Sequence, residues 1–297
     1  MSTERFIDPS TIRKEGIVKE NLTTIEGFPV FSIVEFNIAG NCNRTCSFCP
    51  VSDPKVYHGS KELMDIEVYR KIVTDLADIH YEGKILYSAF SEPLLHKEIE
   101  VLIKITKDKL PKSRVEIVSN GDLITEKKLQ KLFDSGLDTI SISMYDGPEQ
   151  KEYFGKMMTS LGLSDSQVVL RRRYFENGNY GITISNRAGI INSNEYRDEK
   201  EEQVSALPLK QSCYYPFYMT LIDMNGNMLL CPHDWSKTMV FGNTMQNHIW
   251  ELWKSKTIET TRKILAKDNR NFKPCDKCDV DGKVMGTESY LAWKESK

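Results

Sequence analysis

The chain has 297 residues, of which 40% are hydrophobic and 28% charged, as in an ordinary globular protein. Its formal net charge of -2 gives no electrostatic reason to expect nucleic acid or an anionic membrane as a partner. The first residues lack the apolar segment of a signal peptide, and no apolar run reaches membrane-spanning length. Seven cysteines, an odd number, favour metal ligation in a reducing compartment over disulfides, so we predict a cytoplasmic protein.

Strands and helices alternate along the first two thirds of the sequence. Residues 1–28 are polar and irregular, and we expect them to form a lead-in that packs against the main domain. The predicted strands are the runs 30–36, 84–88, 114–119, 139–143 and 167–174. The predicted helices are 65–80, begun by Asp65 as N-cap, 97–107, 126–135 and 148–160. This alternation indicates an α/β fold with a parallel sheet, and about 150 to 175 residues suit an open partial barrel of six strands better than a closed eightfold one.

The first predicted strand leads into a loop, Asn41-Cys-Asn-Arg-Thr-Cys-Ser-Phe-Cys-Pro50, with cysteines in a C-x3-C-x2-C pattern. Thiolate is the soft ligand that iron–sulfur clusters require. Cys42, Cys46 and Cys49 could therefore bind three irons of a 4Fe–4S cluster and leave the fourth iron open. A zinc site is the alternative, but zinc normally takes four ligands, and the nearest further candidate, His58, lies across a loop.

The other four cysteines lie in the last third of the chain, at Cys213, Cys231, Cys275 and Cys278. A charge run at 195–202 precedes them and indicates a solvated linker. Asn225-Gly226 between the apolar runs 217–223 and 227–230 predicts a β-hairpin, and a helix is expected over 248–267 with Ile249, Leu252 and Trp253 facing inward. Four thiolates complete a closed site, either structural zinc or a fully ligated iron–sulfur cluster.

The three-cysteine loop, with Phe48 just before its last cysteine, resembles the signature of the radical S-adenosylmethionine (SAM) superfamily. The resemblance implies that SAM chelates the open iron and is cleaved by the reduced cluster to a 5′-deoxyadenosyl radical. The C-terminal region resembles the Twitch domain, a shortened SPASM domain that carries an auxiliary 4Fe–4S cluster. The implied organisation is a lead-in at 1–28, a partial (β/α)6 TIM-like barrel at 29–190, a linker at 191–210 and a hairpin-plus-helix Twitch domain at 211–297.

The resemblance also implies SAM contacts at the ends of the barrel strands. Glu92, in Phe90-Ser-Glu-Pro-Leu94, matches the glutamate of a Gly-Gly-Glu-like motif, although Phe and Ser replace the glycines. Alternate members of Arg171–Arg173 point to opposite faces of a strand, so at least one can reach SAM's carboxylate. The candidate SAM-binding residues are Phe48, Glu92, Ser119, Asn120, Ser143 and Arg172. Plain turn chemistry is the alternative for Ser119 and Asn120 before Gly121 and for Ser143 before Asp146-Gly147, and a surface loop carboxylate is the alternative for Glu92.

The segment Ile184-Ser-Asn-Arg-Ala-Gly-Ile190 and the late cysteines are similar to the 2-deoxy-scyllo-inosamine dehydrogenase group. This similarity implies oxidation of a secondary alcohol of a sugar or aminocyclitol, with the auxiliary cluster as electron acceptor, Arg187 engaging the substrate hydroxyl, and an electron donor of the flavodoxin or ferredoxin type. A salt bridge from Arg187 to the linker is the alternative for that residue. The alternative functions are a peptide-modifying radical SAM enzyme, a sugar epimerase or dehydratase of the same superfamily, and a non-catalytic metal protein.

Overall fold

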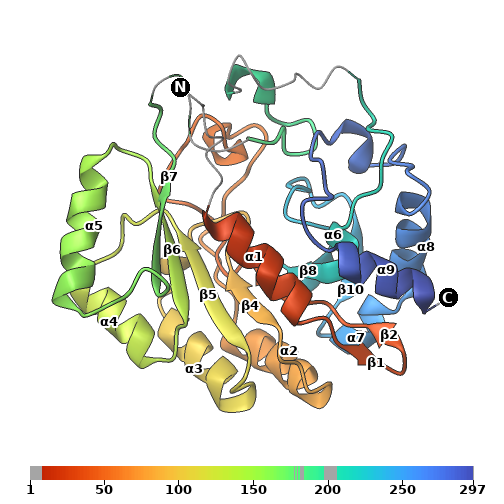
Figure 1. Cartoon of the computed structure of the whole chain (residues 1–297), viewed down its shortest axis with the longest axis horizontal. Coiled ribbons are helices and arrows are strands. Elements are labelled where there is room, and N and C mark those ends of the chain that lie inside the picture. The colour runs from red at the N-terminus through yellow and green to blue at the C-terminus, as the bar shows by residue number, and fades with distance from the viewer. Residues whose placement is uncertain (1–8, 177, 179, 181–183, 197–205, 297) are drawn as a thin grey trace.

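The computed structural model describes residues 9–176, 178, 180, 184–196 and 206–296 (Figure 1). In chain order the strands are β1 (Thr24–Ile25), β2 (Phe28–Pro29), β3 (Ile33–Phe36), β4 (Lys84–Tyr87), β5 (Arg114–Ser119), β6 (Thr139–Met144), β7 (Val168–Arg172), β8 (Met219–Ile222), β9 (Asn227–Leu229) and β10 (Val240–Asn243). The α-helices are α1 (Pro9–Glu20), α2 (Ile66–Asp78), α3 (Ile99–Lys109), α4 (Glu126–Asp134), α5 (Glu149–Ser160), α6 (Tyr215–Tyr218), α7 (Ile249–Trp253), α8 (Lys256–Leu265) and α9 (Thr287–Glu295).

The central sheet has the strand order β10-β9-β8-β3-β4-β5-β6-β7. Its six strands from β8 through β3 to β7 are each parallel to their neighbours, and β9 and β10 extend it in antiparallel fashion. This arrangement confirms the predicted α/β fold with an open, six-stranded parallel core. The carboxyl ends of these strands converge at one edge, where such folds place their functional residues.

The sixth parallel strand comes from a different part of the chain than the sequence indicates. β8 pairs parallel with β3, matching Ile33 to Met219 and Phe36 to Ile222, and pairs antiparallel with β9. Its apolar residues are buried throughout, so they fit a central strand as well as the predicted hairpin. The parallel sheet therefore includes a strand from beyond the linker predicted at 191–210. The described strands within residues 29–190 supply five of its six parallel strands, and β8 supplies the sixth.

Helices α2 to α5 follow the predicted pattern. The Asp65 carboxylate caps α2 by accepting a hydrogen bond from the Glu67 amide at 2.7 Å, as the sequence predicts. The apolar face of α2 buries residues at helical spacing, among them Tyr69, which packs 5.1 Å from the Phe36 ring. Residues Val34, Phe36 and Ile85 thus form the side of the sheet that the helices cover.

The N-terminal segment differs from the prediction, because residues 9–20 form helix α1 and are not irregular. Figure 1 shows α1 (red) crossing the strands, and its Val18 packs in one cluster with Ile33, Leu86 and Met219. These strand residues alternate with the ones under α2 to α5, so α1 covers the inner side of the barrel. Its buried residues Ile17 and Val18 are adjacent and show no helical period, so no amphipathic pattern revealed the helix.

The C-terminal region contains the predicted hairpin, but the expected helix over 248–267 is two helices, α7 and α8. Ser255 between them is extended, with φ −57° and ψ 150°. The break folds α8 back, so the Arg262 guanidinium lies 3.8 Å from the centre of the Trp253 ring and donates to the Trp253 carbonyl at 2.9 Å. Ile249, Leu252 and Trp253 are buried, as predicted.

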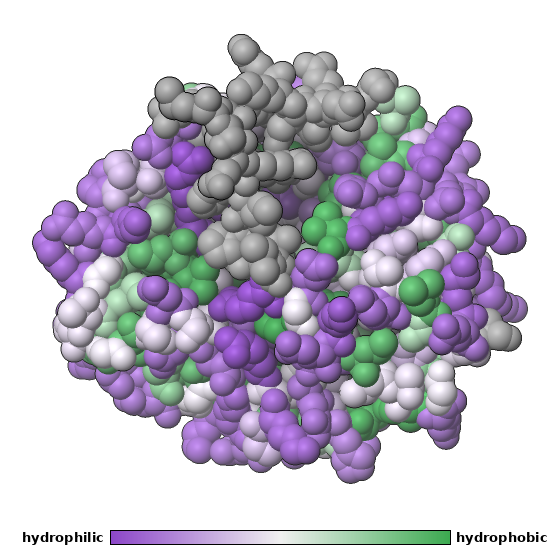
Figure 2. Space-filling model, in the orientation of Figure 1, coloured by the Kyte–Doolittle hydropathy of each residue, from purple (hydrophilic) through white to green (hydrophobic). Residues whose placement is uncertain are grey.

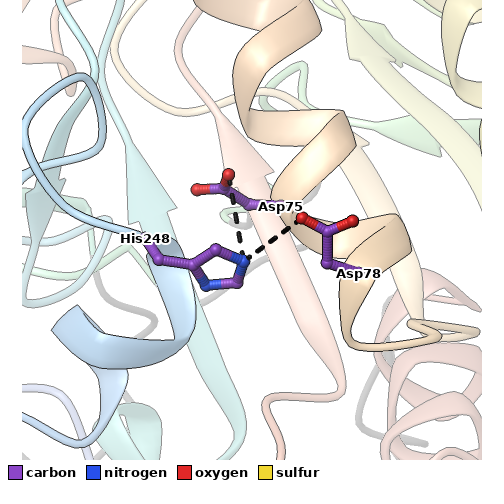
Figure 3. A group of neighbouring side chains, drawn as sticks. All are labelled: Asp75, Asp78 and His248. Carbon is purple, nitrogen blue, oxygen red and sulfur yellow. Dashed lines mark ion pairs between the residues drawn. The ribbon is translucent and has the colours of Figure 1, made fainter.

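Helix α7 is docked against α2 through polar contacts at its N-terminus (Figure 3). The Asp75 carboxylate accepts from the Ile249 amide at 3.0 Å and from Lys71 Nζ at 2.6 Å. His248 Nε2 lies 3.9 Å from Asp75 and 3.7 Å from Asp78, as Figure 3 shows. With β8 in the main sheet, these contacts join the C-terminal region firmly to the barrel.

Among the described helices, none is both long and apolar enough to span a bilayer. Figure 2 shows a face on which hydrophilic side chains predominate and hydrophobic ones occur in small, separate groups. Of the charge run predicted as a linker, residues 197–202 lie outside the described residues.

Candidate active site

A cavity of ≈ 680 Å³ lies inside the barrel and opens toward the carboxyl ends of the parallel strands. Cys42, Cys46 and Cys49, on the loop after β3, line this cavity. Residues after β4, β5 and β6, the inner face of β7, and parts of α1 and the C-terminal region complete its wall. The other four cysteines do not line it, so only one of the two cysteine groups faces the space where small molecules can bind.

The cysteine loop is pinned to the strand ends beside it. Arg44 donates to Asp122 after β5, with Nε 2.8 Å from Oδ2, and to Asp146 after β6, with Nη1 2.7 Å from Oδ1. Its guanidinium also lies 5.2 Å from the centre of the Tyr145 ring. The Asn120 amide reaches the same loop, 3.7 Å from Cys42 Sγ. These contacts hold the loop over the cavity. The carboxylates of Asp146 and Asp122 also raise the pKa of Arg44 above its ordinary value.

The electrostatics of the loop favour a bound cation. Burial raises the pKa of all three thiols, that of Cys46 to about 11, and neighbouring thiolates raise the pKa of Cys42 and Cys46 further. Thiolates crowded in this way are stable only beside positive charge. Iron ions would supply that charge and lower the thiol pKa values.

The four remaining cysteines come together from separate segments, and buried Arg270 organises their surroundings. Its Nε donates to the Gln211 carbonyl at 3.0 Å and its Nη2 to the Ser212 carbonyl at 2.7 Å, and it also donates to the carbonyls of Val280 and Asp281. Arg270 thereby holds the segment before Cys213 against the segment after Cys278. Burial raises the pKa of all four thiols, and nearby thiolates raise the pKa of Cys231, Cys275 and Cys278 further. This site therefore also requires a cationic centre.

The spacing of the thiols distinguishes a cluster from a single zinc ion. Among the described residues, which include all seven cysteines, no three thiol sulfurs lie within 4.8 Å of one another. Four sulfurs bound to one zinc at about 2.3 Å would lie about 3.8 Å apart. A 4Fe–4S cluster separates its cysteine ligands more widely, because each thiolate binds a different iron. Both groups therefore fit a cluster better than zinc.

Five of the six predicted SAM-binding residues line the cavity: Phe48, Glu92, Ser119, Asn120 and Ser143. Glu92 is buried and accepts hydrogen bonds from the Leu94 amide at 3.0 Å, Ser119 Oγ at 2.9 Å and the Asn120 amide at 2.8 Å. Burial raises the pKa of Glu92 to about 7 despite these three donors. Glu92 is thus no surface carboxylate, and an ammonium group in the cavity would be its natural partner.

The prediction that Arg172 is the SAM-binding arginine of the run 171–173 requires a correction. Arg171 and Arg173 line the cavity, whereas Arg172 points to the other side of β7, where its Nη1 lies 2.9 Å from Glu176 Oε2. The alternation of side chains along a strand explains the difference, since choosing the middle residue selects the wrong face. Arg171 and Arg173 replace Arg172 as candidates for a carboxylate in the cavity.

Arg187 lines the cavity from a loop that is bound to the four-cysteine region. The Asn186 amide donates to Asp279 Oδ1 at 2.8 Å, and the Asn186 side chain donates to the Lys277 carbonyl at 2.7 Å. Arg187 itself has a left-handed backbone, with φ 49°, and its buried Nε has no hydrogen-bond partner among the described residues. It lowers the pKa of Cys49, so its charge is close to the cysteine loop.

Several residues with no recognisable motif also line the cavity: Lys14, Glu35, Tyr145, Tyr215, His233 and Trp235. His233 is hydrogen-bonded between Ser185 Oγ at 3.1 Å and Tyr215 Oη at 3.3 Å, and burial lowers its pKa to about 3. Only Glu35 gave a usable signal in the sequence, as a charged residue in an otherwise apolar strand. The others reach the cavity through tertiary packing.

Comparison with protein families supports this geometry. A model described as Radical SAM superfamily matches residues 36–168, and a SPASM model, described as an iron-sulfur cluster-binding domain, matches residues 213–279. The chain therefore contains a radical SAM domain followed by a SPASM domain. Cys42, Cys46 and Cys49 lie within the Radical SAM match, and the four later cysteines lie within the SPASM match. The cofactors of this radical SAM protein are therefore two 4Fe–4S clusters and SAM, as the sequence predicts.

Similarity to individual proteins extends over most of the chain. The S-adenosyl-L-methionine-dependent 2-deoxy-scyllo-inosamine dehydrogenase of Niallia circulans is 28% identical over 262 residues, which cover 88% of this chain and 97% of that protein. The crystal structure of BtrN in complex with AdoMet and 2-DOIA superposes with a TM-score of 0.70 at 26% identity, over 88% of this chain and 97% of BtrN. A probable GTP 3′,8-cyclase of Methanococcus maripaludis is 31% identical over only 38% of this chain and 37% of the cyclase.

Proposed function

We propose that this radical SAM protein is a dehydrogenase that oxidises a secondary alcohol of an aminocyclitol, or of a closely related polyhydroxylated ring, to a ketone. The proposal includes an electron donor of the flavodoxin or ferredoxin type and a reducing, cytoplasmic setting for the clusters. The alternatives within the superfamily are not favoured, because the similarity to an aminocyclitol dehydrogenase covers 88% of this chain and 97% of that protein.

The observation that carries the proposal is the position of Arg187. Its side chain lines the cavity that contains the Cys42 loop, and its backbone neighbour Asn186 is hydrogen-bonded to the Cys275–Asp279 segment. A substrate held by Arg187 is therefore close to both cysteine groups. Its buried Nε has no hydrogen-bond partner in the part of the chain that the structure describes, and it is suited to an oxygen atom of a bound substrate.

Oxidation of an alcohol removes a hydrogen atom from carbon, a proton from oxygen and one further electron, and the C–O bond becomes C=O. Once bound, SAM and the two clusters supply the hydrogen-atom acceptor, a 5′-deoxyadenosyl radical, and the electron acceptor. The chain's own residues position the reactants. Glu92 binds the ammonium of SAM, and Arg171 or Arg173 pairs with its carboxylate.

Arg187 acts on the substrate oxygen. Its guanidinium stabilises negative charge that develops on this oxygen as the proton leaves, and it stays protonated throughout. Stabilising this charge favours transfer of the electron, because a deprotonated radical is a stronger reductant than a protonated one. Arg187 is therefore an electrostatic anchor and not a base.

The test is anaerobic reconstitution with iron and sulfide, followed by reduction in the presence of SAM and 2-deoxy-scyllo-inosamine. We expect about eight irons per chain, 5′-deoxyadenosine, and one ketone per deoxyadenosine. Deoxyadenosine without any ketone, from this ring or from related cyclitols and sugars, would refute the dehydrogenase proposal. The matches to the radical SAM and SPASM domains would stand in that case.

A further inference from the structure

A charged pair on one wall of the cavity takes no part in the contacts described so far. Lys14, from helix α1, and Glu35, from strand β3, both line the cavity. Glu35 is only 4% exposed, and its carboxylate receives hydrogen bonds from Ser88 and the Ala89 amide. The two described side chains influence each other electrostatically, yet no ion pair within 4.0 Å joins them. Both side chains therefore line the cavity without forming a direct ion pair with each other.

This pair belongs to the same wall as Arg187. Both Arg187 and Lys14 act on His233, whose pKa they help to lower. Glu35 acts on Tyr215, whose hydroxyl lies 3.3 Å from His233 Nε2. A ligand that contacts Arg187 on this wall can thus extend to Glu35 and Lys14.

The SAM-binding candidates are other residues of the cavity wall, although Glu92 follows β4, the strand that pairs with β3. Glu92, Ser119 and Asn120 form one hydrogen-bonded group after β4 and β5, and Arg171 and Arg173 project from β7. β3, which carries Glu35, is separated from β7 by three strands. The polar groups of SAM consequently have partners of their own, and the Lys14–Glu35 pair is left for the second reactant.

We propose that Lys14 and Glu35 form a subsite that recognises the substrate ring on the side away from the oxidised carbon. This inference deepens the proposed function and rests on it. Glu35 accepts a hydrogen bond from an ammonium or hydroxyl group of the ring, and Lys14 donates to a neighbouring ring hydroxyl. A donor and an acceptor on adjacent carbons are typical of cyclitols and aminocyclitols, and an apolar side chain of a peptide would leave both charges unpaired. Helix α1 is accordingly part of the substrate site and not only a cover for the barrel.

The experiment compares Glu35→Gln and Lys14→Met with two controls, Glu67→Gln and Lys19→Met. The control side chains are 73% and 70% exposed, and Lys19 lies on the same helix as Lys14. Binding of 2-deoxy-scyllo-inosamine to reconstituted, SAM-loaded but unreduced protein is measured by isothermal titration calorimetry, and KM is measured under reducing conditions. Thermal unfolding of each variant establishes that it is folded.

We expect Kd and KM to rise by about tenfold or more for Glu35→Gln and for Lys14→Met, because each loses a charge-assisted hydrogen bond in a desolvated cavity. The controls keep the wild-type values. The binding of a cyclitol that has a hydroxyl in place of the amino group shows which donor contacts Glu35. If the ammonium contacts Glu35, the Glu35→Gln change weakens binding of the amine far more than binding of the hydroxyl analogue. An equal loss for both ligands assigns a ring hydroxyl to Glu35.

Two results would overturn the subsite. Kd and KM within twofold of wild type in both folded variants would show that Lys14 and Glu35 do not meet the substrate, while leaving the proposed function intact. Should one variant fail to fold, an unchanged Kd in the other would be sufficient. A wild-type protein that neither binds nor oxidises these rings would instead refute the proposed function, and the subsite with it.

Discussion

The two cysteine groups of this protein are built in opposite ways. Cys42, Cys46 and Cys49 lie on one short loop, line the cavity, and are held in place from outside by the ion pairs of Arg44. The four later cysteines come from separate segments, are closed off from the cavity, and are gathered around Arg270, which binds backbone carbonyls. A reactive centre needs an open coordination position that faces its substrates, whereas an electron acceptor needs only proximity and protection from water.

The largest expected effect comes from removing the open site. Replacing Cys42, Cys46 and Cys49 with Ala should reduce 5′-deoxyadenosine formation to background, since no ligand set remains to place SAM on iron. Deoxyadenosine is measured by chromatography after anaerobic reduction. Continued cleavage of SAM by this variant would refute the assignment of the loop.

Removing ligands from the four-cysteine site should separate SAM cleavage from substrate oxidation. In a Cys275→Ala, Cys278→Ala double variant we expect iron to fall from about eight to about four per chain. Some SAM cleavage should persist, but ketone formation should stop because the electron has no acceptor. Full turnover without these thiols would exclude the auxiliary cluster as electron acceptor.

Arg187 lies between the two groups, and its loss should affect only the substrate step. Arg187→Ala should lower ketone formation by about 10²-fold, the usual effect of deleting one donor to a developing oxyanion. Cleavage of SAM should continue without product. Arg187→Lys keeps the charge and should be intermediate, and unimpaired oxidation by Arg187→Ala would remove the residue from the site.

Arg44 should matter for the lifetime of the open cluster. Arg44→Gln removes the ion pairs to Asp122 and Asp146, so we expect iron to be lost to a chelator several-fold faster, with a changed electron paramagnetic resonance spectrum of the reduced cluster. Arg44→Lys should rescue this only in part, because lysine cannot form the two-pronged contact. The exposed Arg70→Gln serves as control, and equal rates of iron loss in Arg44→Gln and Arg70→Gln would contradict the anchoring role.

The smallest effect is a pH dependence at Glu92. Because burial raises its pKa from 4.5 to about 7, the folded state binds a proton that the unfolded state has already lost. The stability from this proton is complete below about pH 4.5 and is lost as the pH rises through 7. Between pH 6 and 8, the unfolding free energy of SAM-free wild type should therefore fall by about 1–2 kcal/mol relative to Glu92→Gln.

Urea unfolding at each pH measures this difference. Saturating SAM should flatten the pH dependence, because an ammonium beside Glu92 lowers the carboxyl pKa again. If the difference in unfolding free energy between wild type and Glu92→Gln does not change with pH, or grows in favour of wild type as the pH rises, the raised pKa of Glu92 is contradicted.

Much of the fold was readable in the sequence because its signals are local. Apolar strands, helices with buried faces at 3.6-residue spacing, and the Asp65 cap each depend on neighbours along the chain. The polar helix α1 lacked such a period and was not predicted, and the break at Ser255 depends on Arg262 packing onto Trp253 from the next helix.

The sequence by itself determined the chemistry of this protein. Cysteine spacing along one loop is a local property, and it predicted an iron–sulfur cluster and a resemblance to radical SAM proteins. The predicted strands, which are also local, placed Glu92, Ser119 and Asn120 at strand ends. Tertiary structure decided everything that depends on which face or which neighbour a residue has. It selected Arg171 and Arg173 over Arg172, placed β8 beside β3, and brought Lys14 and Glu35 to the wall that carries Arg187. These outcomes depend on strand register and on contacts between distant segments, and local sequence patterns do not specify either.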